Sequence, residues 1–87
     1  IGSNVETLYH ILDSRAEALE FVIREESEVT GIPLMNLNLK NNLLIGCINR
    51  GGNIKIARGQ DCIQQGDTVI VLTSQKGLRD IRDILRK

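Results

Sequence analysis

Hydrophobic and polar residues alternate most clearly over residues 16–24, Ala-Glu-Ala-Leu-Glu-Phe-Val-Ile-Arg. Leu19, Phe21 and Ile23 fall on one side of this segment, and smaller or charged residues fall on the other. A period of two residues is typical of a strand with one buried face. The pattern therefore predicts a half-buried strand, which ends at the acidic run over residues 25–28.

Three further runs indicate strands. Leu43–Arg50 is apolar on both faces, which places it centrally in a sheet or at an interface. Asn53–Arg58 follows a Gly51-Gly52 pair, and two glycines are typical of a hairpin turn that needs positive φ at both positions. We expect Ile54 and Ile56 to face inward and Lys55 outward. The β-branched run Thr68–Thr73 predicts a buried central strand.

Helical spacing predicts three helices. Over residues 3–13, Val5, Leu8 and Leu12 form an apolar stripe, and Ser3 and Glu6 have the spacing of a capping box. A short helix over residues 30–39 starts near Pro33, with Leu34, Leu37 and Met35 facing inward. A last helix spans residues 76–86 and carries one apolar face, formed by Leu78, Ile81, Ile84 and Leu85.

The predicted order of elements is therefore α-β-α-β-β-β-α. We expect an α+β fold, with a small mixed four-stranded sheet and flanking helices. Residues 1–13 form a linker or hinge helix in this reading, and residues 14–87 form the folded domain.

Composition limits the class of protein. Eighty-seven residues make one small domain, with 41% apolar and 25% charged residues, as is ordinary for a globular chain. Net charge is zero and the aromatic residues are Tyr9 and Phe21, which argues against a nucleic-acid binder. We see neither an apolar run of the roughly 20 residues that cross a bilayer nor a signal peptide, so we expect a cytoplasmic setting.

Charge is distributed unevenly along the chain. Residues 1–39 hold two basic and seven acidic residues, whereas residues 40–87 hold nine and four. Either opposite charges meet across the folded surface, or a surface of one sign faces a partner. We favour the first reading, because the halves of so small a domain must interleave.

The chain offers little for catalysis. The lone His10 has no cysteine or serine beside it, and Asp61 and Asp67 stand in turn-like contexts where Asp bonds local backbone. Cys47 and Cys62 lack the spacing of a metal pair and suit structural positions. We therefore predict neither an enzyme nor a metal site.

Assembly is the alternative that remains. A domain of this size buries its surface poorly, and a symmetric homodimer is the usual remedy. The two-sided apolar strand supplies the candidate dimer interface, with Leu44, Ile45, Cys47 and Ile48 as its residues.

The chain resembles a known family. Its ordered segments look like the C-terminal lobe of the regulator of potassium conductance domain, above all that of the TrkA-type peripheral subunits of bacterial potassium uptake systems (the TrkA-C domain). The resemblance extends from about residue 4 and includes a Gly66-Asp67 turn before an apolar strand. The matching segments are residues 16–24, 31–37, 44–50, 56–59 and 63–72.

This resemblance implies a cytoplasmic regulatory lobe, peripheral to the inner face of the membrane, that dimerises and controls a membrane potassium transporter of the Trk or Ktr type. In the family an N-terminal lobe binds NAD or ATP, and this chain lacks the glycine-rich fingerprint of that lobe. No cofactor is expected in the present domain.

The resemblance also implies an alternative, a sensor that binds a nucleotide such as cyclic di-AMP in the dimer cleft. Its candidate ligand residues are Asn53, Ile54, Lys55, Ile56 and Arg58. The sequence departs from the ligand-binding pattern, because Ala57 and Arg58 stand where proline is expected.

Overall fold

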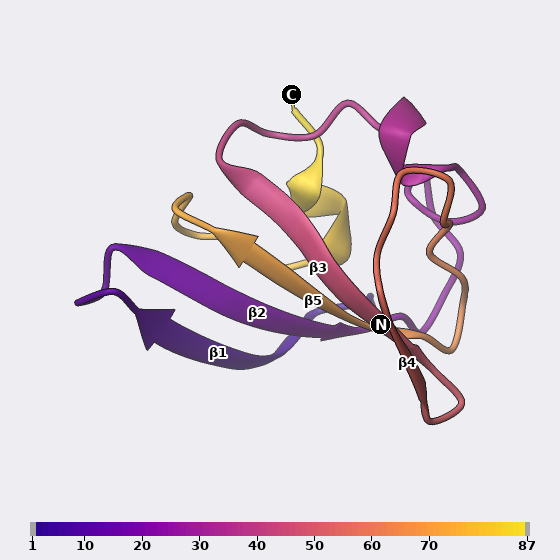
Figure 1. Ribbon diagram of the computed structural model, residues 1–87, viewed down its shortest axis with the longest axis horizontal. Coiled ribbons are helices and arrows are strands. Elements are labelled where there is room, and N and C mark those ends of the chain that lie inside the picture. Colours follow the sequence, from indigo (N-terminus) through magenta and orange to yellow (C-terminus); the bar gives the residue numbers. More distant parts are fainter. Residues whose placement is uncertain (1, 87) are drawn as a thin grey trace.

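Five strands form one sheet in the order β1-β2-β5-β3-β4, and every neighbouring pair is antiparallel (Figure 1). The computed structural model describes residues 2–86, so that Ile1 and Lys87, the outer ends of the predicted segments 1–13 and 14–87, lie outside the described residues. The strands are β1 (Val5–Ile11), β2 (Ala16–Val22), β3 (Leu43–Arg50), β4 (Asn53–Ile56) and β5 (Thr68–Thr73). Two 3-10 helices accompany them: η1 (Leu34–Asn36) lies between β2 and β3, and η2 (Ile81–Ile84) follows β5.

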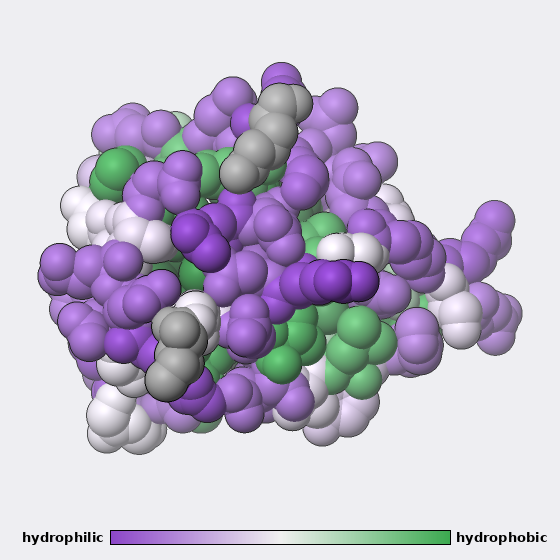
Figure 2. Space-filling view, turned by 180° about the vertical axis from the view of Figure 1, so that it is seen from behind, coloured by the Kyte–Doolittle hydropathy of each residue, from purple (hydrophilic) through white to green (hydrophobic). Residues whose placement is uncertain are grey.

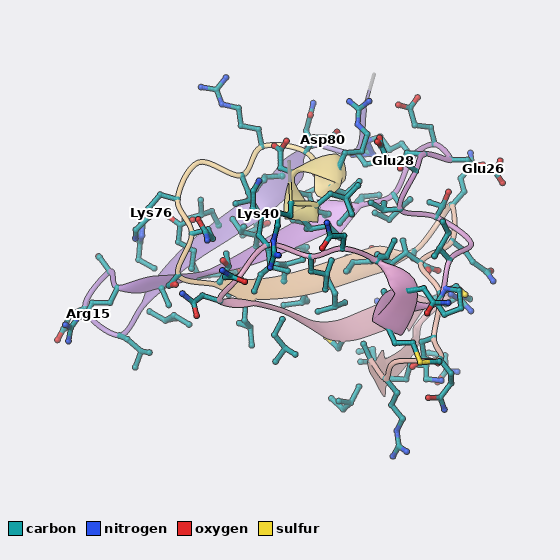
Figure 3. The ribbon with its side chains drawn as sticks, turned by 90° about the horizontal axis from the view of Figure 1, so that it is seen from above. Arg15, Glu26, Glu28, Lys40, Lys76 and Asp80 are labelled. Carbon is teal, nitrogen blue, oxygen red and sulfur yellow. The ribbon has the colours of Figure 1, made fainter. Side chains whose placement is uncertain are left out.

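The hydrophobic core lies on one face of this sheet. Alternation in β2 and β5 turns Leu19, Phe21, Val69 and Val71 to that face, where none of them is exposed. η2 and the connecting segments cover them and contribute Val29, Leu34, Ile63, Leu78, Ile81 and Ile84 to the core. η2 lies over this face of the central strands, and no helix or strand of residues 2–86 covers the opposite face of those strands (Figures 1 and 3).

The four predicted strands are confirmed as β2, β3, β4 and β5. The predicted hairpin is also present, since Gly51 and Gly52 take φ of 59° and 87° between β3 and β4. β5 lies in the middle of the sheet, as its β-branched run predicts.

The predicted helix over residues 3–13 is wrong, because Val5–Ile11 forms the edge strand β1. Val5, Thr7, Tyr9 and Ile11 are β-branched or aromatic and alternate along the segment, which favours a strand. The Ser3 hydroxyl does not cap a helix but accepts the backbone N–H of Arg24 at 2.9 Å. The supposed hinge helix is therefore part of the sheet.

The helix predicted over residues 30–39 is reduced to η1. Pro33 precedes it as expected and Leu34 is buried, but Met35 is 69% exposed rather than inward. Leu37 already has extended backbone, with φ of −83° and ψ of 140°, so the helix ends after one turn.

The last predicted helix, residues 76–86, is likewise wrong apart from η2. Gly77 has a φ of 87°, which a right-handed helix cannot include. Asp80 then begins η2 with a capping box shared with Asp83. Leu78, Ile81 and Ile84 are buried as predicted, because a spacing of three residues also suits a 3-10 turn.

These corrections change the fold class. The sheet has five antiparallel strands rather than four mixed ones, and its covering layer is coil with two short 3-10 helices rather than flanking α-helices. Within residues 2–86, no helix has the length and apolar character to cross a membrane.

Candidate functional site: the uncovered face of the sheet

The face of the sheet that points away from the core is formed by the alternate residues of all five strands. Cross-strand pairing places Tyr9, Ala18, Leu72 and Leu44 in one row across β1, β2, β5 and β3. A second row contains Thr7, Glu20, Ile70, Cys47 and Ile56, and a third contains Val22, Thr68, Asn49 and Ile54. We call these residues, together with Ile11 and Ala16, the bare face.

Large hydrophobic side chains dominate the bare face. Ile56 is 73% exposed, Ile54 66%, Tyr9 63% and Leu44 61%. Single exposed apolar residues are ordinary, but neighbours on adjacent strands form a contiguous patch, which indicates an interaction surface.

The two sides of the molecule differ in character. Seen from the side of η2, the surface is largely hydrophilic, with hydrophobic areas in its lower half and smaller ones toward the upper left (Figure 2). The labelled charged side chains Glu26, Glu28, Lys40 and Asp80 also lie on the η2 side of the sheet (Figure 3). Among the described residues, six of the ten exposed large hydrophobic side chains belong to the bare face: Tyr9, Ile11, Leu44, Ile54, Ile56 and Leu72.

The prediction that Ile54 and Ile56 face inward is wrong. β4 is an edge strand, and its pairing with β3 puts Ile56 beside Cys47 and Ile54 beside Asn49 on the bare face. Alternation predicts that the two isoleucines share a face, but it does not tell which face is covered.

The predicted dimer residues divide between the two faces. Ile45 and Ile48 lie in the core at 4% and 1% exposure. A bulge in β3 between Ile45 and Cys47 allows both isoleucines, three positions apart, to face inward. Leu44 and Cys47 lie on the bare face. Of the four predicted residues, these two are therefore placed where a second copy could contact them, whereas Ile45 and Ile48 are buried inside the domain.

The predicted ligand residues lie along the open edge formed by β4. Asn53–Ile56 are all exposed, and the Lys55 ammonium is held 2.8 Å from Asp61 Oδ1. Arg58 instead lines an apolar cavity of about 200 Å³ with Leu34, Met35, Leu39, Leu43, Leu44, Ile45, Ala57 and Gly59. The five candidates therefore do not surround one cavity in the single domain.

Asp61 serves the turn that follows β4. Its Oδ2 accepts the backbone N–H of Arg58 at 2.7 Å, as turn chemistry predicts. The hydrogen bond from Lys55, together with that from the Arg58 backbone, lowers the pKa of Asp61 below its usual value. Asp61 thus fixes the chain leaving the hairpin and stays ionised.

Asp67 connects the hairpin to the central strand. Its side chain is buried, and both carboxylate oxygens accept hydrogen bonds from Arg50, at 2.8 and 2.9 Å. The backbone N–H of Gln64 adds a further bond at 2.8 Å. Burial alone would raise the pKa of Asp67, but the bonds from Arg50 and Gln64 lower it overall. The end of β3 is thereby anchored to the start of β5.

Sequence reasoning missed the burial of Glu17, which is 5% exposed. Its Oε2 lies 3.8 Å from Lys76 Nζ and 4.0 Å from His10 Nδ1, and its Oε1 has no hydrogen-bond partner among the described residues. The signal was available, because Glu17 shares the strand parity of Leu19 and Phe21. Within residues 2–86, no group of three or more His, Cys, Asp or Glu side chains could hold a metal ion.

Sequence reasoning also missed the extent of the bare face. It treated one strand as two-sided and assigned β1 to a helix, so Tyr9 and Ile11 were left out of the surface. Reading Val5, Thr7, Tyr9 and Ile11 as alternating β-formers would have supplied the missing edge.

Comparison with known proteins gives one consistent family. Residues 18–86 match the sequence profile of the TrkA-C domain. A Trk system potassium uptake protein TrkA homolog of Pyrococcus abyssi is 34% identical over 73 residues, which cover 83% of this chain and 32% of that protein.

Two further relatives carry similar names. The Trk system potassium uptake protein TrkA of Haemophilus influenzae is 36% identical over 76 residues, covering 84% of this chain and 16% of its own length. TrkA homolog 1 of Methanosarcina mazei is 28% identical over 81 residues, covering 93% and 18%. The chain therefore spans a third or less of the length of these curated relatives.

Proposed function

This chain belongs to the TrkA-C domain family, and on that premise we propose that it is the regulatory and dimerisation lobe of a potassium uptake system. The relatives named above are potassium uptake proteins. In the proposed role the domain performs no chemistry. It pairs two copies of a cytoplasmic regulator that acts on a membrane potassium transporter.

The observation that carries this proposal is the bare face. Five strands about 4.8 Å apart, each contributing about five residues of 3.3 Å, give a face of about 300–400 Å². The large hydrophobic side chains occupy part of this area and share it with Thr7, Glu20, Asn49 and Thr68, and the largest apolar patch of a small protein is often a functional contact surface. Its occupant is proposed to be the same face of a second copy, because a self-complementary patch closes a two-fold dimer.

Size also sets the expected strength of this contact. Standard stable interfaces bury about 800 Å² on each partner. The bare face supplies about half of that, so the rims of β1 and of the β3–β4 hairpin must contribute the remainder. We therefore expect a reversible dimer whose population depends on protein concentration.

Regulation would follow from linkage between lobes. If the dimer contact is more favourable in one arrangement of the attached lobes than in another, dimer formation shifts the lobes toward the favoured arrangement. NAD or ATP binding is proposed for a lobe outside this chain, and the paired TrkA-C domains would pass the resulting change to the transporter. In the proposed role the working protein acts at the cytoplasmic surface of the membrane.

Potassium uptake by cells that depend on the full-length protein tests the role. Ile56→Lys puts a charge in the bare face, and Ile32→Lys makes the same change at a loop residue that is 37% exposed. We expect Ile56→Lys to impair the control of uptake and Ile32→Lys to leave it intact. Equal behaviour of the two variants, with both proteins present at wild-type levels, would overturn the proposal.

A further inference from the structure

Three stretches of the chain converge on a polar pocket on the η2 side of the sheet, away from the bare face. Lys40, Asn41, Gln75 and Arg86 line this pocket, an open depression with a volume of about 370 Å³. The Lys40 side chain lies beside η2 (Figure 3). Small-molecule sites commonly measure about 300–1,000 Å³, so the cavity has room for a small metabolite.

The walls of the pocket are held together by backbone hydrogen bonds between distant segments. The N–H of Lys40 donates to the carbonyl of Ile84 at 2.9 Å, and the N–H of Arg86 donates to that of Asn38 at 2.8 Å. On the third side, the N–H of Ser74 donates to the carbonyl of Asn42 at 3.1 Å. Because these segments are already ordered in the folded domain, a ligand would not lose binding free energy by ordering them.

Both cations of the pocket are held by neutral acceptors. Arg86 donates to the side-chain oxygen of Asn41 at 2.6 Å, and the Lys40 ammonium donates to the backbone carbonyl of Asp83. The nearby Asp83 carboxylate accepts the backbone N–H groups of Arg79 and Asp80 at 2.8 and 3.0 Å. Neither Lys40 nor Arg86 forms an ion pair with a carboxylate of residues 2–86.

Donors therefore outnumber acceptors in the pocket. Gln75 Nε2 already occupies the backbone carbonyl of Asn41, at 3.1 Å, so both oxygens of Asn41 are in use. A guanidinium and an ammonium each carry several N–H groups, and one bond apiece leaves the others available. Positive charge with spare donors on two walls complements an anion that accepts from several directions.

We propose that this pocket binds a phosphate-type oxyanion, with Lys40 and Arg86 as the charged donors and Gln75 and Asn41 as amide donors. A tetrahedral phosphoryl group offers oxygens in several directions, which suits donors on separate walls better than a planar carboxylate does. The volume exceeds the need of a single phosphate, so the ligand class is a small phosphorylated compound. The site is independent of the dimer face and of its proposed role.

Amide NMR of the 87-residue chain tests the site, with pyrophosphate as the probe and ionic strength kept constant with sodium chloride. We expect saturable shifts confined to the amides around residues 40–42, 75 and 84–86. The paired variant Lys40→Gln/Arg86→Gln should weaken binding by about tenfold or more, since it removes both charge-assisted donors. Arg15→Gln/Arg58→Gln, which removes the same two positive charges at residues outside the pocket lining, should leave it unchanged.

Further arms separate the sources of the phosphoryl group. ATP should shift the same amides as pyrophosphate, and vesicles of phosphatidylglycerol should shift them no more than neutral vesicles. Absence of saturable pyrophosphate shifts, equal affinity in the paired variant, or a response to anionic vesicles alone would each overturn the proposal. If the amide shifts of a variant away from the pocket equal those of the wild type, the variant is folded. A loss of its pyrophosphate-induced shifts then reports a loss of binding.

Discussion

Asp67 carries its negative charge inside the domain because N–H donors surround it. Arg50 supplies the paired donors and Gln64 a backbone donor, and Arg50 also donates to the backbone carbonyl of Cys62 at 2.9 Å. The carboxylate thus connects the end of β3 to the loop before β5. If the Arg50 guanidinium were lost, the buried Asp67 carboxylate would keep only the Gln64 N–H as a donor. Leaving a charge buried in this way strongly lowers the free energy of unfolding.

Arg50→Ala is therefore expected to lower the free energy of unfolding by about 2–3 kcal/mol. This is less than the roughly 3–5 kcal/mol typical of fully buried ion pairs, because the Arg50 side chain is 48% exposed. Urea unfolding at neutral pH measures the change, and Arg50→Lys should recover part of it by restoring a charge without the planar fork. Arg15→Ala serves as the surface control. A loss no larger than that of the control would show that Arg50 does not stabilise Asp67.

The same pair predicts acid sensitivity. Because Arg50 and Gln64 hold the pKa of Asp67 below its ordinary 3.8, protonation favours the unfolded chain. The contribution is complete above that ordinary value and is lost as the pH falls through the lower, folded-state pKa. Unfolding free energy measured from pH 6 downward should fall more steeply in the wild type than in Asp67→Asn, and parallel curves would contradict this assignment.

Among the elements, four of the five strands could be predicted from the sequence, whereas the three predicted helices are either absent or reduced to short 3-10 helices. β2 alternates between buried and half-buried residues, and β5 is a β-branched run; both patterns are typical of strands. Val5–Ile11 also fits a helical stripe, and its alternating β-branched and aromatic residues, together with pairing to β2, decide in favour of the strand. The buried positions of the last segment were predicted correctly because the core requires Leu78, Ile81 and Ile84 in either conformation.

The candidate site was predictable in part. The two-sided apolar character of β3 pointed to an interface, and Leu44 and Cys47 do lie on the bare face. Ile54 and Ile56 were assigned to the core because sequence gives the period of a strand but not the side on which η2 packs. That choice depends on the tertiary path of residues 74–86.

Gly77 takes a backbone conformation that the predicted helix over residues 76–86 could not include. Its φ is 87° and an added Cβ would meet no atom within 4 Å, so the cost of a side chain is conformational alone. We expect Gly77→Ala to destabilise the domain by about 1–2 kcal/mol. Gly77→Asn should cost less, since Asn tolerates this region; thermal unfolding compares the two. Equal stability of Gly77→Ala and the wild type would mean that the turn adjusts freely.

At the scale of the whole molecule, the charge asymmetry of the sequence is only partly cancelled by contact. Most ion pairs between the described residues join bases and acids of the same half, as in Arg24–Glu6 and Lys55–Asp61, whereas Lys76–Glu17 joins the two halves. Among the described residues, our prediction that opposite charges of the two halves meet across the folded surface is met by one ion pair, Lys76–Glu17. The basic half instead supplies the oxyanion pocket.

Two surfaces of different character emerge from one small sheet. Alternation gives the sheet two apolar faces, and η2 with its neighbouring segments covers only one of them. The bare face is apolar and suits a second copy, while the η2 side is polar and carries the pocket. A ligand on the η2 side would therefore leave the dimer face unobstructed.

Sedimentation velocity of the 87-residue chain over a wide concentration range tests the central claim, that the bare face pairs two copies, most directly. The wild type and Ile32→Lys should move from monomer to dimer as concentration rises, whereas Ile56→Lys should stay monomeric with unchanged circular dichroism. Monomer at every concentration in the wild type, or dimerisation of Ile56→Lys equal to that of Ile32→Lys, would contradict the account.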